Sequence, residues 1–282
     1  MLERLVATLS PVRLLNSIAA AAPAETLTDL AYGRAPRQRL DVYVPRSAGP
    51  HPLAMFFYGG GWEEGERGIY RFVGAALAAA GIVTMIPDYR VYPDVRFPGF
   101  VEDGASAVAW AIENAAKFGA DPERLVLMGH SAGAHIAAML ALDTQWLKAL
   151  GVPACMVRGL VGLAGPYDFV PDTQTRRIIF GLERDRARTQ PISFARPDAP
   201  PALLVSGVND KVVDPGNARR LAHRLTQVGA CAETHFYPHP SHESLIGAFS
   251  PALRFIAPVF RHTVDFVSRA TLAPVRRHEV AA

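Results

Sequence analysis

Short apolar runs alternate with segments of helical periodicity along most of the chain. The apolar runs predict strands over residues 39–44, 53–57, 82–86, 125–128, 160–163, 202–205 and 233–237. The periodic segments predict helices over about 70–80, 101–117, 134–142, 215–228 and 244–270. Such alternation predicts an α/β fold: a doubly wound, mostly parallel central sheet with helices on both faces. The run over 39–44 alternates with period two, which predicts an early antiparallel strand at the sheet edge.

The length of 282 residues fits a single domain over 1–282 with a small cap. Residues 1–24 carry apolar residues at helical spacing, which favours an N-terminal helical arm that stays attached. The alternative is a cleaved signal peptide, although Pro11 interrupts its apolar region. Residues 166–200 are polar and punctuated by proline, as a cap-like insertion would be, and residues 271–282 form a tail.

Composition excludes several classes of function. Half of the residues are hydrophobic and a fifth are charged, so the chain can bury a sizeable core. The net charge of +3 arises from scattered basic residues, and the run over 183–188 alternates with acids as a solvated helix face does, which argues against nucleic-acid binding. No apolar run is long enough to span a membrane. Cys155 and Cys231 lack metal-ligand spacing, so we expect a reduced, cytoplasmic protein, or an exported one if residues 1–24 are a signal peptide.

The most informative motif is Gly129-His130-Ser131-Ala132-Gly133. An apolar run precedes it, and a segment rich in helix formers follows it. A strand, a G-x-S-x-G turn and a helix together predict a nucleophile elbow. The turn is tight, and glycine two positions to either side of the serine leaves the space that it needs. We therefore expect Ser131 to be a nucleophile at a helix N-terminus, where negative charge is favoured.

A serine hydroxyl needs a base to take its proton and an acid to orient that base. In a doubly wound sheet, both should lie on loops just after the carboxyl ends of strands. Asp210 follows the apolar run over 202–205, and His242 follows the run over 233–237. The sequence therefore predicts a triad of Ser131, Asp210 and His242.

Other aspartates and histidines compete for these roles. Asp214 follows Asp210 by four residues, but its position suits the N-terminus of the next helix. His239 lies between two prolines, and His235 would lie inside the last strand. His130 and His135, which flank the elbow, suit packing or hydrogen bonding better than proton transfer.

A second loop can supply donors for a developing oxyanion. Tyr58-Gly59-Gly60-Gly61-Trp62 directly follows the buried run over 53–57. Three glycines let the backbone turn its N–H groups toward the site without a Cβ in the way. Gly60 and Gly61, with the N–H of Ala132, are the predicted oxyanion hole. Tyr58 and Trp62 are candidates for the substrate pocket, and for Trp62 packing beneath the loop is an equal alternative.

These motifs resemble the α/β-hydrolase superfamily, in particular its hormone-sensitive-lipase-like carboxylesterases and kynurenine-formamidase-like hydrolases. The order of nucleophile, acid and base is also the order of that superfamily. In these families the glycine motif usually begins with histidine, whereas this chain has Tyr58. Asp88, Tyr89, Asp103 and Asp168 are expected to be structural. The matching segments are Tyr58–Trp62, Asp88–Arg90 with Phe97-Pro98, Glu102-Asp103, Gly129–Gly133, Gly165–Asp168 and the loops that carry Asp210 and His242.

The resemblance implies a serine carboxylester hydrolase that forms an acyl-enzyme on a small or short-chain ester. No metal or cofactor is expected, and the expected partner is a small-molecule ester rather than a nucleic acid or a membrane. An arylformamidase or amidase is the alternative chemistry. A non-catalytic ligand-binding protein of the same fold is the alternative class, against which the intact Ser131, Asp210 and His242 argue.

Overall fold

Eight strands form one sheet in the computed structural model, which describes residues 24–181 and 183–272. The order across the sheet is β1-β2-β4-β3-β5-β6-β7-β8, with antiparallel pairing of β1 with β2 and of β2 with β4, and parallel pairing elsewhere. This is the doubly wound, mostly parallel α/β-hydrolase sheet that the sequence predicts. The strands are β1 (Ala24–Ala31), β2 (Arg39–Pro45), β3 (His51–Phe57), β4 (Val83–Pro87), β5 (Ala120–His130), β6 (Val157–Leu163), β7 (Ala202–Gly207) and β8 (Ala232–Tyr237).

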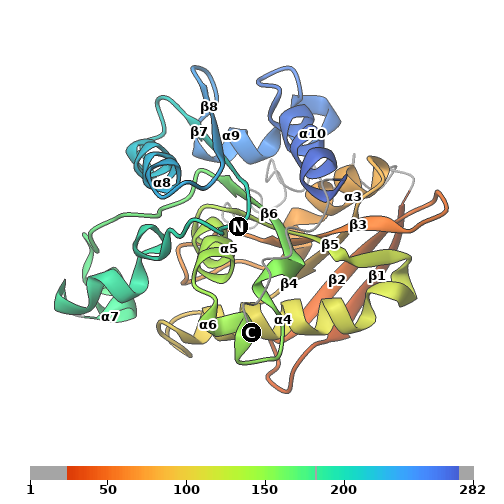
Figure 1. The fold of residues 1–282 in the computed structure, drawn as a ribbon, viewed down its shortest axis with the longest axis horizontal. Coiled ribbons are helices and arrows are strands. Elements are labelled where there is room, and N and C mark those ends of the chain that lie inside the picture. The colour runs from red at the N-terminus through yellow and green to blue at the C-terminus, as the bar shows by residue number, and fades with distance from the viewer. Residues whose placement is uncertain (1–23, 182, 273–282) are drawn as a thin grey trace, which may run out of the picture.

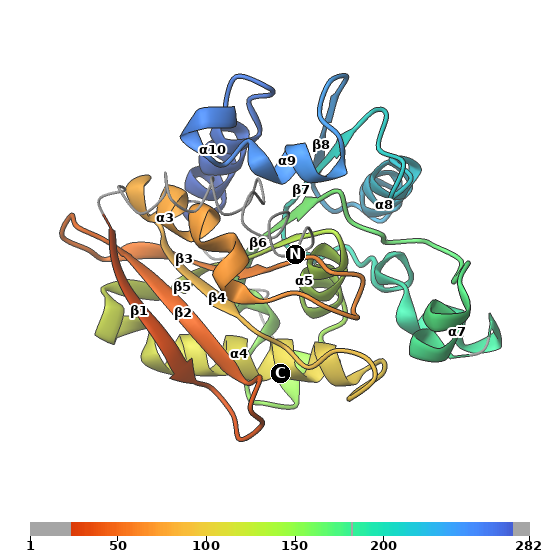
Figure 2. The ribbon, with the colours of Figure 1, turned by 180° about the vertical axis from the view of Figure 1, so that it is seen from behind.

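Helices cover both faces of this sheet (Figures 1 and 2). In both views α3 and α10 lie together, while α4 and α5 pack against each other on the opposite face. The α-helices are α3 (Arg71–Ala79), α4 (Gly99–Asn114), α5 (Ala132–Leu142), α6 (Gln145–Lys148), α7 (Gln174–Phe180), α8 (Gly216–Gln227), α9 (His242–Gly247) and α10 (Val259–Leu272). The 3-10 helices are η1 (Arg67–Tyr70), η2 (Ala115–Phe118), η3 (Ala154–Met156), η4 (Glu183–Thr189), η5 (Pro191–Phe194) and η6 (Pro251–Leu253).

Burial is deepest around β3, β4, β5 and α5. Every residue of β4 is buried. This is expected for a strand that is covered on both faces of the sheet. Every residue of α5 is buried too, so this helix is apolar all round. The sequence motif at the start of α5 is therefore held by the most tightly enclosed part of the molecule.

The sheet edge differs from the sequence prediction. The strand expected at the edge, now β2, is antiparallel but pairs on both sides, because β1 lies outside it. The large apolar residues of β1, AETLTDLA, are Leu27 and Leu30, and the pairing with β2 is interrupted by a register shift between them. Because these leucines are three positions apart, the strand lacks the period-two alternation by which a strand is predicted. The helical arm expected over 1–24 and the tail expected over 271–282 fall mainly outside the described residues.

The prediction of a single helix over 244–270 is also wrong. The chain instead forms α9, then η6, then α10. Pro251 opens η6, and Pro258 directly precedes α10. Proline cannot donate an N–H to a helix and clashes with the preceding turn, so a continuous helix cannot cross these positions. The break makes His242 the first residue of a short separate helix.

The segment over 166–200 connects β6 to β7 and projects from the body of the molecule as α7, η4 and η5 (Figure 1). Asp168 ties it down, because its carboxylate pairs with Arg186 at 2.8 Å and with Arg220 of α8 at 2.7 Å. The charged run over 183–188 is a 3-10 helix. It is not merely a solvated face, since Arg186 makes this contact while Arg184 stays exposed.

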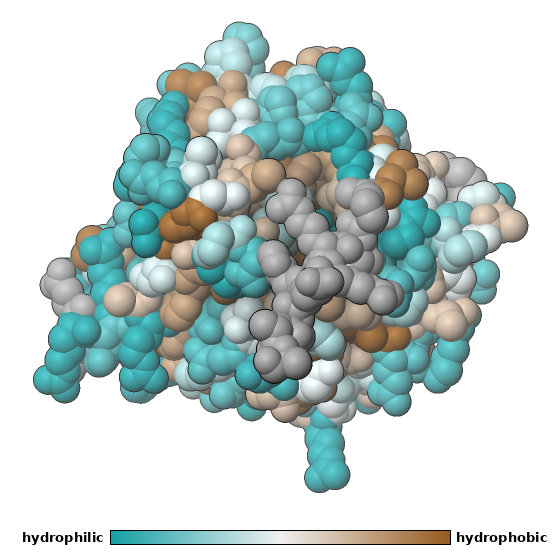
Figure 3. All heavy atoms as spheres, viewed as in Figure 1, coloured by the Kyte–Doolittle hydropathy of each residue, from teal (hydrophilic) through white to brown (hydrophobic). Residues whose placement is uncertain are grey.

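The surface drawn in Figure 3 is mostly polar, with apolar side chains interspersed among hydrophilic ones. Among the helices of residues 24–181 and 183–272, none has the length and apolar character needed to cross a bilayer.

Candidate active site

Ser131 lies between the last residue of β5 and the first residue of α5. Its φ of 55° and ψ of −124° are a strained conformation for a residue with a side chain. Backbone hydrogen bonds hold it, because its N–H donates to the carbonyl of Leu163 in β6 at 2.9 Å and its carbonyl accepts the N–H of Ala134 at 2.9 Å. Ser131 is half-buried, whereas His130 and Ala132 beside it are buried. The turn therefore presents the serine outward from an enclosed base.

The two glycines of the motif are required by the backbone that passes beside them. A Cβ at Gly133 would lie 2.1 Å from the carbonyl oxygen of Phe57 in β3. A Cβ at Gly129 would lie 2.3 Å from the carbonyl oxygen of Gly133. Both obstacles are backbone atoms, which cannot swing aside as a side chain can. The close approach of β3, β5 and α5 explains why only glycine fits at these positions.

Asp210 and His242 meet although they are far apart in the sequence. Nδ1 of His242 lies 2.8 Å from Oδ2 of Asp210. An ionised carboxylate can only accept, so Nδ1 carries the proton and Nε2 is left as the basic nitrogen. The second oxygen of Asp210 accepts the N–H groups of Val212 and Val213 at 2.9 and 3.0 Å. The arrangement can therefore fix both the orientation and the tautomer of the imidazole.

The loops that carry these two residues pack closely. A Cβ at Gly207 would lie 2.3 Å from the carbonyl oxygen of Pro240, so the end of β7 abuts the loop before His242. Ser241 caps α9 and fixes the first helical turn. Burial raises the pKa of Asp210, but the hydrogen bonds from His242 and the backbone outweigh burial and hold that pKa below its ordinary value. Asp210 is therefore ionised when His242 is neutral.

The competing residues lie outside this pair. The carboxylate of Asp214 accepts a backbone N–H at the start of α8 at 2.9 Å, the helix-terminal role that the sequence suggests. His239 is exposed on the loop after β8. His235 lies inside β8, where its ring stacks on that of His262 with centroids 4.1 Å apart.

The glycine loop lies beside the serine. A Cβ at Gly59 would lie 3.0 Å from the Cβ of Ser131, so the start of the loop touches the elbow. Gly60 has a φ of 142° and Gly61 a φ of 63°, values that glycine adopts without strain. Within the described residues, the N–H groups of Gly60, Gly61 and Ala132 have no protein acceptor. These donors are thus available next to the elbow.

His130 and His135, on either side of the elbow, are buried and neutral. Burial, reinforced by repulsion from His242, lowers the pKa of His130 to about 3. Nε2 of His130 lies 3.1 Å from the carbonyl oxygen of His242 and donates to it. Burial lowers the pKa of His135 to about 4, and its Nε2 donates to the carbonyl of Thr189 at 2.8 Å. Both serve as hydrogen-bond donors, as their sequence positions suggest.

Trp62 is buried at the end of the glycine loop. Its ring stacks on Phe169, with centroids 5.6 Å apart, and meets the edges of Phe180 and His135 at 4.7 and 5.3 Å. Phe169 and Phe180 belong to the segment over 166–200, and the N–H of His135 bonds to the carbonyl of Ser131 at 3.3 Å. The indole therefore packs between the elbow helix and the inserted segment.

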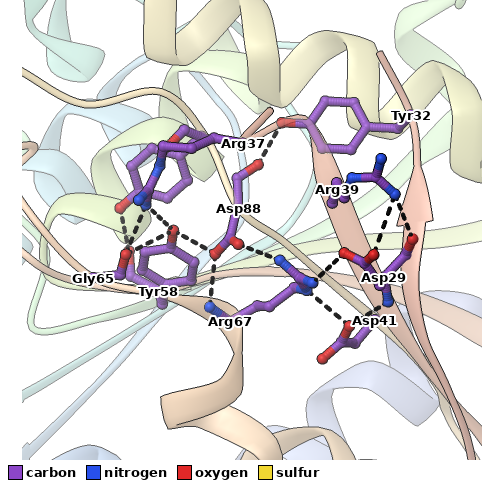
Figure 4. A network of polar contacts seen from close by, with 10 residues as sticks. Asp29, Tyr32, Arg37, Arg39, Asp41, Tyr58, Gly65, Arg67 and Asp88 are labelled. Atoms are coloured by element: carbon purple, nitrogen blue, oxygen red, sulfur yellow. Dashed lines mark hydrogen bonds and ion pairs between the residues drawn. The ribbon is translucent and has the colours of Figure 1, made fainter. Parts of the chain in front are cut away.

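Tyr58 does not line an open pocket, because its side chain is completely buried. Its hydroxyl donates to Asp88 at 2.8 Å and accepts from Arg37 at 3.0 Å (Figure 4). Arg37 also donates to the carbonyl of Gly65 at 2.6 Å, and the N–H of Arg67 donates to Asp88 at 2.7 Å. The sequence gives no signal for Arg37, since it joins the site from the connection between β1 and β2.

The remaining residues of the shared motifs are structural, as expected. Asp103 in α4 accepts from the guanidinium of Arg90 at 2.7 Å and from the amide of Gln38 at 2.8 Å. The hydroxyl of Tyr89 donates to the carbonyl of Tyr58 at 2.7 Å. Across residues 24–181 and 183–272, no three His, Cys, Asp or Glu side chains gather as metal ligands would.

Three relatives from other organisms are similar to this chain in sequence. A probable isoprenylcysteine alpha-carbonyl methylesterase of Arabidopsis thaliana is 30% identical over 77% of this chain and 50% of its own length. Esterase LipC of Mycobacterium tuberculosis is 34% identical over 70% of this chain and 54% of its own. Kynurenine formamidase of Danio rerio is 33% identical over 54% of this chain and 50% of its own. The chain thus spans about half the length of these curated relatives.

A solved structure and a family model are also similar to this chain. A truncated carbohydrate esterase from gut microbiota has a TM-score of 0.79 at 20% identity, covering 90% of this chain and 99% of its own, which shows a shared fold. The family model described as BD-FAE matches residues 40–225, a span that includes the glycine loop, the elbow and Asp210. The chain has the α/β-hydrolase fold and belongs to the BD-FAE family.

Proposed function

We propose that this protein is a serine hydrolase that cleaves carboxylic esters through an acyl-enzyme. The observation that carries the proposal is the 2.8 Å contact between His242 Nδ1 and Asp210, on loops beside the strained turn of Ser131. The naming of relatives as methylesterase and esterase supports the same reaction class. The mechanism below follows from the placement of these groups.

In acylation, the Oγ of Ser131 forms a bond to the ester carbonyl carbon while its proton passes to Nε2 of His242. Asp210 stabilises the imidazolium that results, because its carboxylate faces Nδ1. As the tetrahedral intermediate collapses, the bond to the alcohol oxygen breaks and His242 returns the proton to that oxygen. Water then repeats the sequence on the acyl-enzyme, and the carboxylic acid and free Ser131 are released.

Negative charge develops on the carbonyl oxygen in both halves of the reaction. The N–H groups of Gly60, Gly61 and Ala132 have no protein acceptor within the described residues, so the oxyanion can accept from them. Ala132 is also the first residue of α5, where the helix dipole favours negative charge. Such preorganised donors are each worth on the order of 10²- to 10³-fold in kcat.

The substrate class that fits this site is a small or short-chain ester. Trp62 fills the space between the glycine loop and the inserted segment, held by Phe169 and Phe180. A packed aromatic wall at this position restricts the length of the acyl group. The expected partner is therefore a small-molecule ester.

A formamide is the second candidate substrate, favoured by the similarity to a kynurenine formamidase over 54% of this chain. The same residues would attack a formyl carbon and protonate an amine as the leaving group. Comparing N-formylkynurenine with p-nitrophenyl butyrate as substrates separates the two chemistries. A higher kcat/KM for the formamide would move the assignment to that class.

Ser131→Ala tests the proposal. We expect it to lower kcat on p-nitrophenyl butyrate by on the order of 10⁴-fold or more, because triad members act as a unit. It should also abolish covalent labelling by a fluorophosphonate. Ser106→Ala is the matched control, since that hydroxyl bonds only to the carbonyl of Glu102 within α4. A Ser131→Ala protein with more than a tenth of wild-type activity would refute the mechanism, and a folded wild type that neither hydrolyses nor labels would indicate a binding protein.

A further inference from the structure

The loop that carries the oxyanion donors is held in its middle, where the carbonyl of Trp62 accepts the N–H of Tyr92 at 2.9 Å, and again at its far end. It runs from Gly59 to Glu66, between β3 and η1. Its first turn closes on itself, because the carbonyl of Gly60 accepts the N–H groups of Glu63 and Glu64, both at 3.0 Å. The carbonyl of Gly65, near the end of the loop, instead accepts from the side chain of Arg37 at 2.6 Å.

Arg37 has three acceptors, and all of them belong to elements around this loop (Figure 4). Its Nη2 donates to the carbonyl of Gly65 at 2.6 Å and to the hydroxyl of Tyr58 at 3.0 Å. Its Nε donates to the carbonyl of Tyr89 at 2.9 Å. Arginine suits this role, since its planar group offers several N–H donors in fixed directions.

Tyr58 directly precedes Gly59, so its hydroxyl links Arg37 to the start of the loop. Burial keeps its hydroxyl protonated by raising its pKa far above the ordinary value, so it donates to Asp88 at 2.8 Å and accepts from Arg37. Asp88 in turn accepts the N–H of Arg67, just beyond the loop, at 2.7 Å. The tyrosine ring is held between Tyr70 and Tyr89, with centroids 5.6 and 4.7 Å away.

The loop has little freedom to settle elsewhere. Gly65 has a φ of 112°, and a Cβ there would lie 2.7 Å from the ring of Tyr58. The same loop touches the elbow, where a Cβ at Gly59 would lie 3.0 Å from that of Ser131. A shift at Gly65 therefore carries to the N–H groups of Gly60 and Gly61, whose catalytic value depends on their direction.

We propose that Arg37 is a positioning residue for the oxyanion hole, acting on the loop through the Gly65 carbonyl and the Tyr58 hydroxyl. Tyr58 stands at the start of the glycine motif, and Arg37 contacts it from the connection between β1 and β2. The inference rests on the proposed function, because it assigns the loop to stabilisation of an oxyanion. It assigns a functional role to Arg37, which lies in the connection between β1 and β2.

Arg37→Ala should lower kcat on p-nitrophenyl butyrate by about 10- to 100-fold with little change in KM, because oxyanion donors act chiefly in the transition state. Arg39→Ala is the matched control. Arg39 lies near Arg37 in the same hairpin, but its side chain pairs with Asp29 at 3.2 Å and, among the described residues, has no hydrogen bond or ion pair to the loop. Its kcat should stay within about twofold of wild type.

Two further measurements separate positioning from general stability. Added guanidinium chloride at low millimolar concentration should restore part of the kcat of Arg37→Ala and leave that of Arg39→Ala unchanged. Tyr58→Phe keeps the stacked ring but removes the hydroxyl, and it should show the same loss in kcat at unchanged KM. If Arg37→Ala does not fold, Tyr58→Phe decides the matter alone.

The proposal is overturned if Arg37→Ala matches Arg39→Ala in kcat, if its loss lies in KM, or if Tyr58→Phe is fully active. These outcomes differ from failure of the proposed function, which is judged by Ser131→Ala. A dead Ser131→Ala with a fully active Arg37→Ala leaves the hydrolase intact and removes only the positioning role. An active Ser131→Ala removes the basis of both.

Discussion

The ring of His130 donates a hydrogen bond to the backbone carbonyl of His242 across 3.1 Å, and the two ring centroids are 4.8 Å apart. His130 directly precedes Ser131 in the elbow, and His242 begins α9. This contact joins the turn at Ser131 to the backbone of His242, the proposed base, and leaves the His242 side chain free to contact Asp210. Because burial keeps His130 neutral, its Nε2–H remains a donor at any pH near neutrality.

Replacing His130 tests this link. His130→Ala removes a buried hydrogen bond, which costs about 0.5–1.5 kcal/mol of unfolding free energy. It also frees the loop that holds His242, so kcat should fall while Ser131 still labels with a fluorophosphonate, though more slowly. Urea unfolding and steady-state kinetics give both quantities. His223→Ala, an exposed histidine on α8, is the control, and equal behaviour of the two variants would disprove the link.

The assignment of base and acid makes a paired prediction. His242→Ala and Asp210→Asn should each lower kcat by about 10³-fold or more, because the imidazole is lost in one and its tautomer is no longer fixed in the other. His239→Ala and Asp214→Asn should keep most of the activity, since His239 is exposed and Asp214 contacts the start of α8. Kinetics of the four variants on one ester decide the matter. Equal damage from both histidine variants would leave the base unassigned, and damage from His239→Ala alone would reverse it.

The elbow could be predicted from the sequence because its requirements are local. The spacing of Gly129 and Gly133 is set by the turn, in which a Cβ at Gly129 would meet the backbone of Gly133, while the close approach of Phe57 to Gly133 comes from β3. The positions of Asp210 and His242 after predicted strands were enough to pair them, since parallel strands place their carboxyl ends along one edge. In the structure His242 Nδ1 and Asp210 Oδ2 lie 2.8 Å apart, while their roles as base and acid stay a prediction.

Other features could not be predicted because they depend on tertiary contacts. Nothing local marks Arg37, whose acceptors lie 21 to 52 residues away in the sequence. The position of Tyr58 beside the glycines predicts a pocket residue, yet its buried hydroxyl is hydrogen-bonded to Asp88 and Arg37. The edge strand β1, which lacks a clear hydrophobic pattern, is placed by its pairing with β2. In each case the position in the fold depends on contacts with residues that are distant in the sequence.

Acid should destabilise the fold through the two buried histidines. Burial lowers the pKa of His130 to about 3 and of His135 to about 4, from an ordinary value of 6.5. Below pH 6.5 the unfolded chain binds protons that the folded chain does not, so the unfolding free energy falls as the pH drops toward 4. The slope should be on the order of 1 kcal/mol per pH unit for each histidine.

Urea unfolding between about pH 4.5 and pH 8 measures that slope. His135→Gln should make the acid limb shallower, because one of the two groups no longer titrates on unfolding. His223→Gln, at an exposed position on α8, should leave the limb unchanged. Identical pH dependence for wild type and His135→Gln would show that burial of this histidine does not govern acid stability.

The aromatic packing around Trp62 predicts the order of substrate preference. Its ring packs against Phe169, Phe180 and His135 next to the elbow helix, and we propose that this packing limits the length of the acyl chain. We expect acetate to hexanoate p-nitrophenyl esters to be hydrolysed faster than palmitate esters, with no jump in rate when the substrate forms an interface.

Phe169→Ala gives this expectation a structural test. Phe169 is half-buried, so its removal opens space against Trp62 at a smaller cost in stability than truncating the buried indole would carry. The chain-length optimum should move toward longer esters, while Val170→Ala, at the exposed neighbouring position, should leave it in place. Profiles of kcat/KM against chain length for wild type and both variants measure the shift. An unchanged optimum in Phe169→Ala would remove the aromatic wall as its cause, and faster turnover of long-chain emulsions than of soluble butyrate would refute the short-chain preference itself.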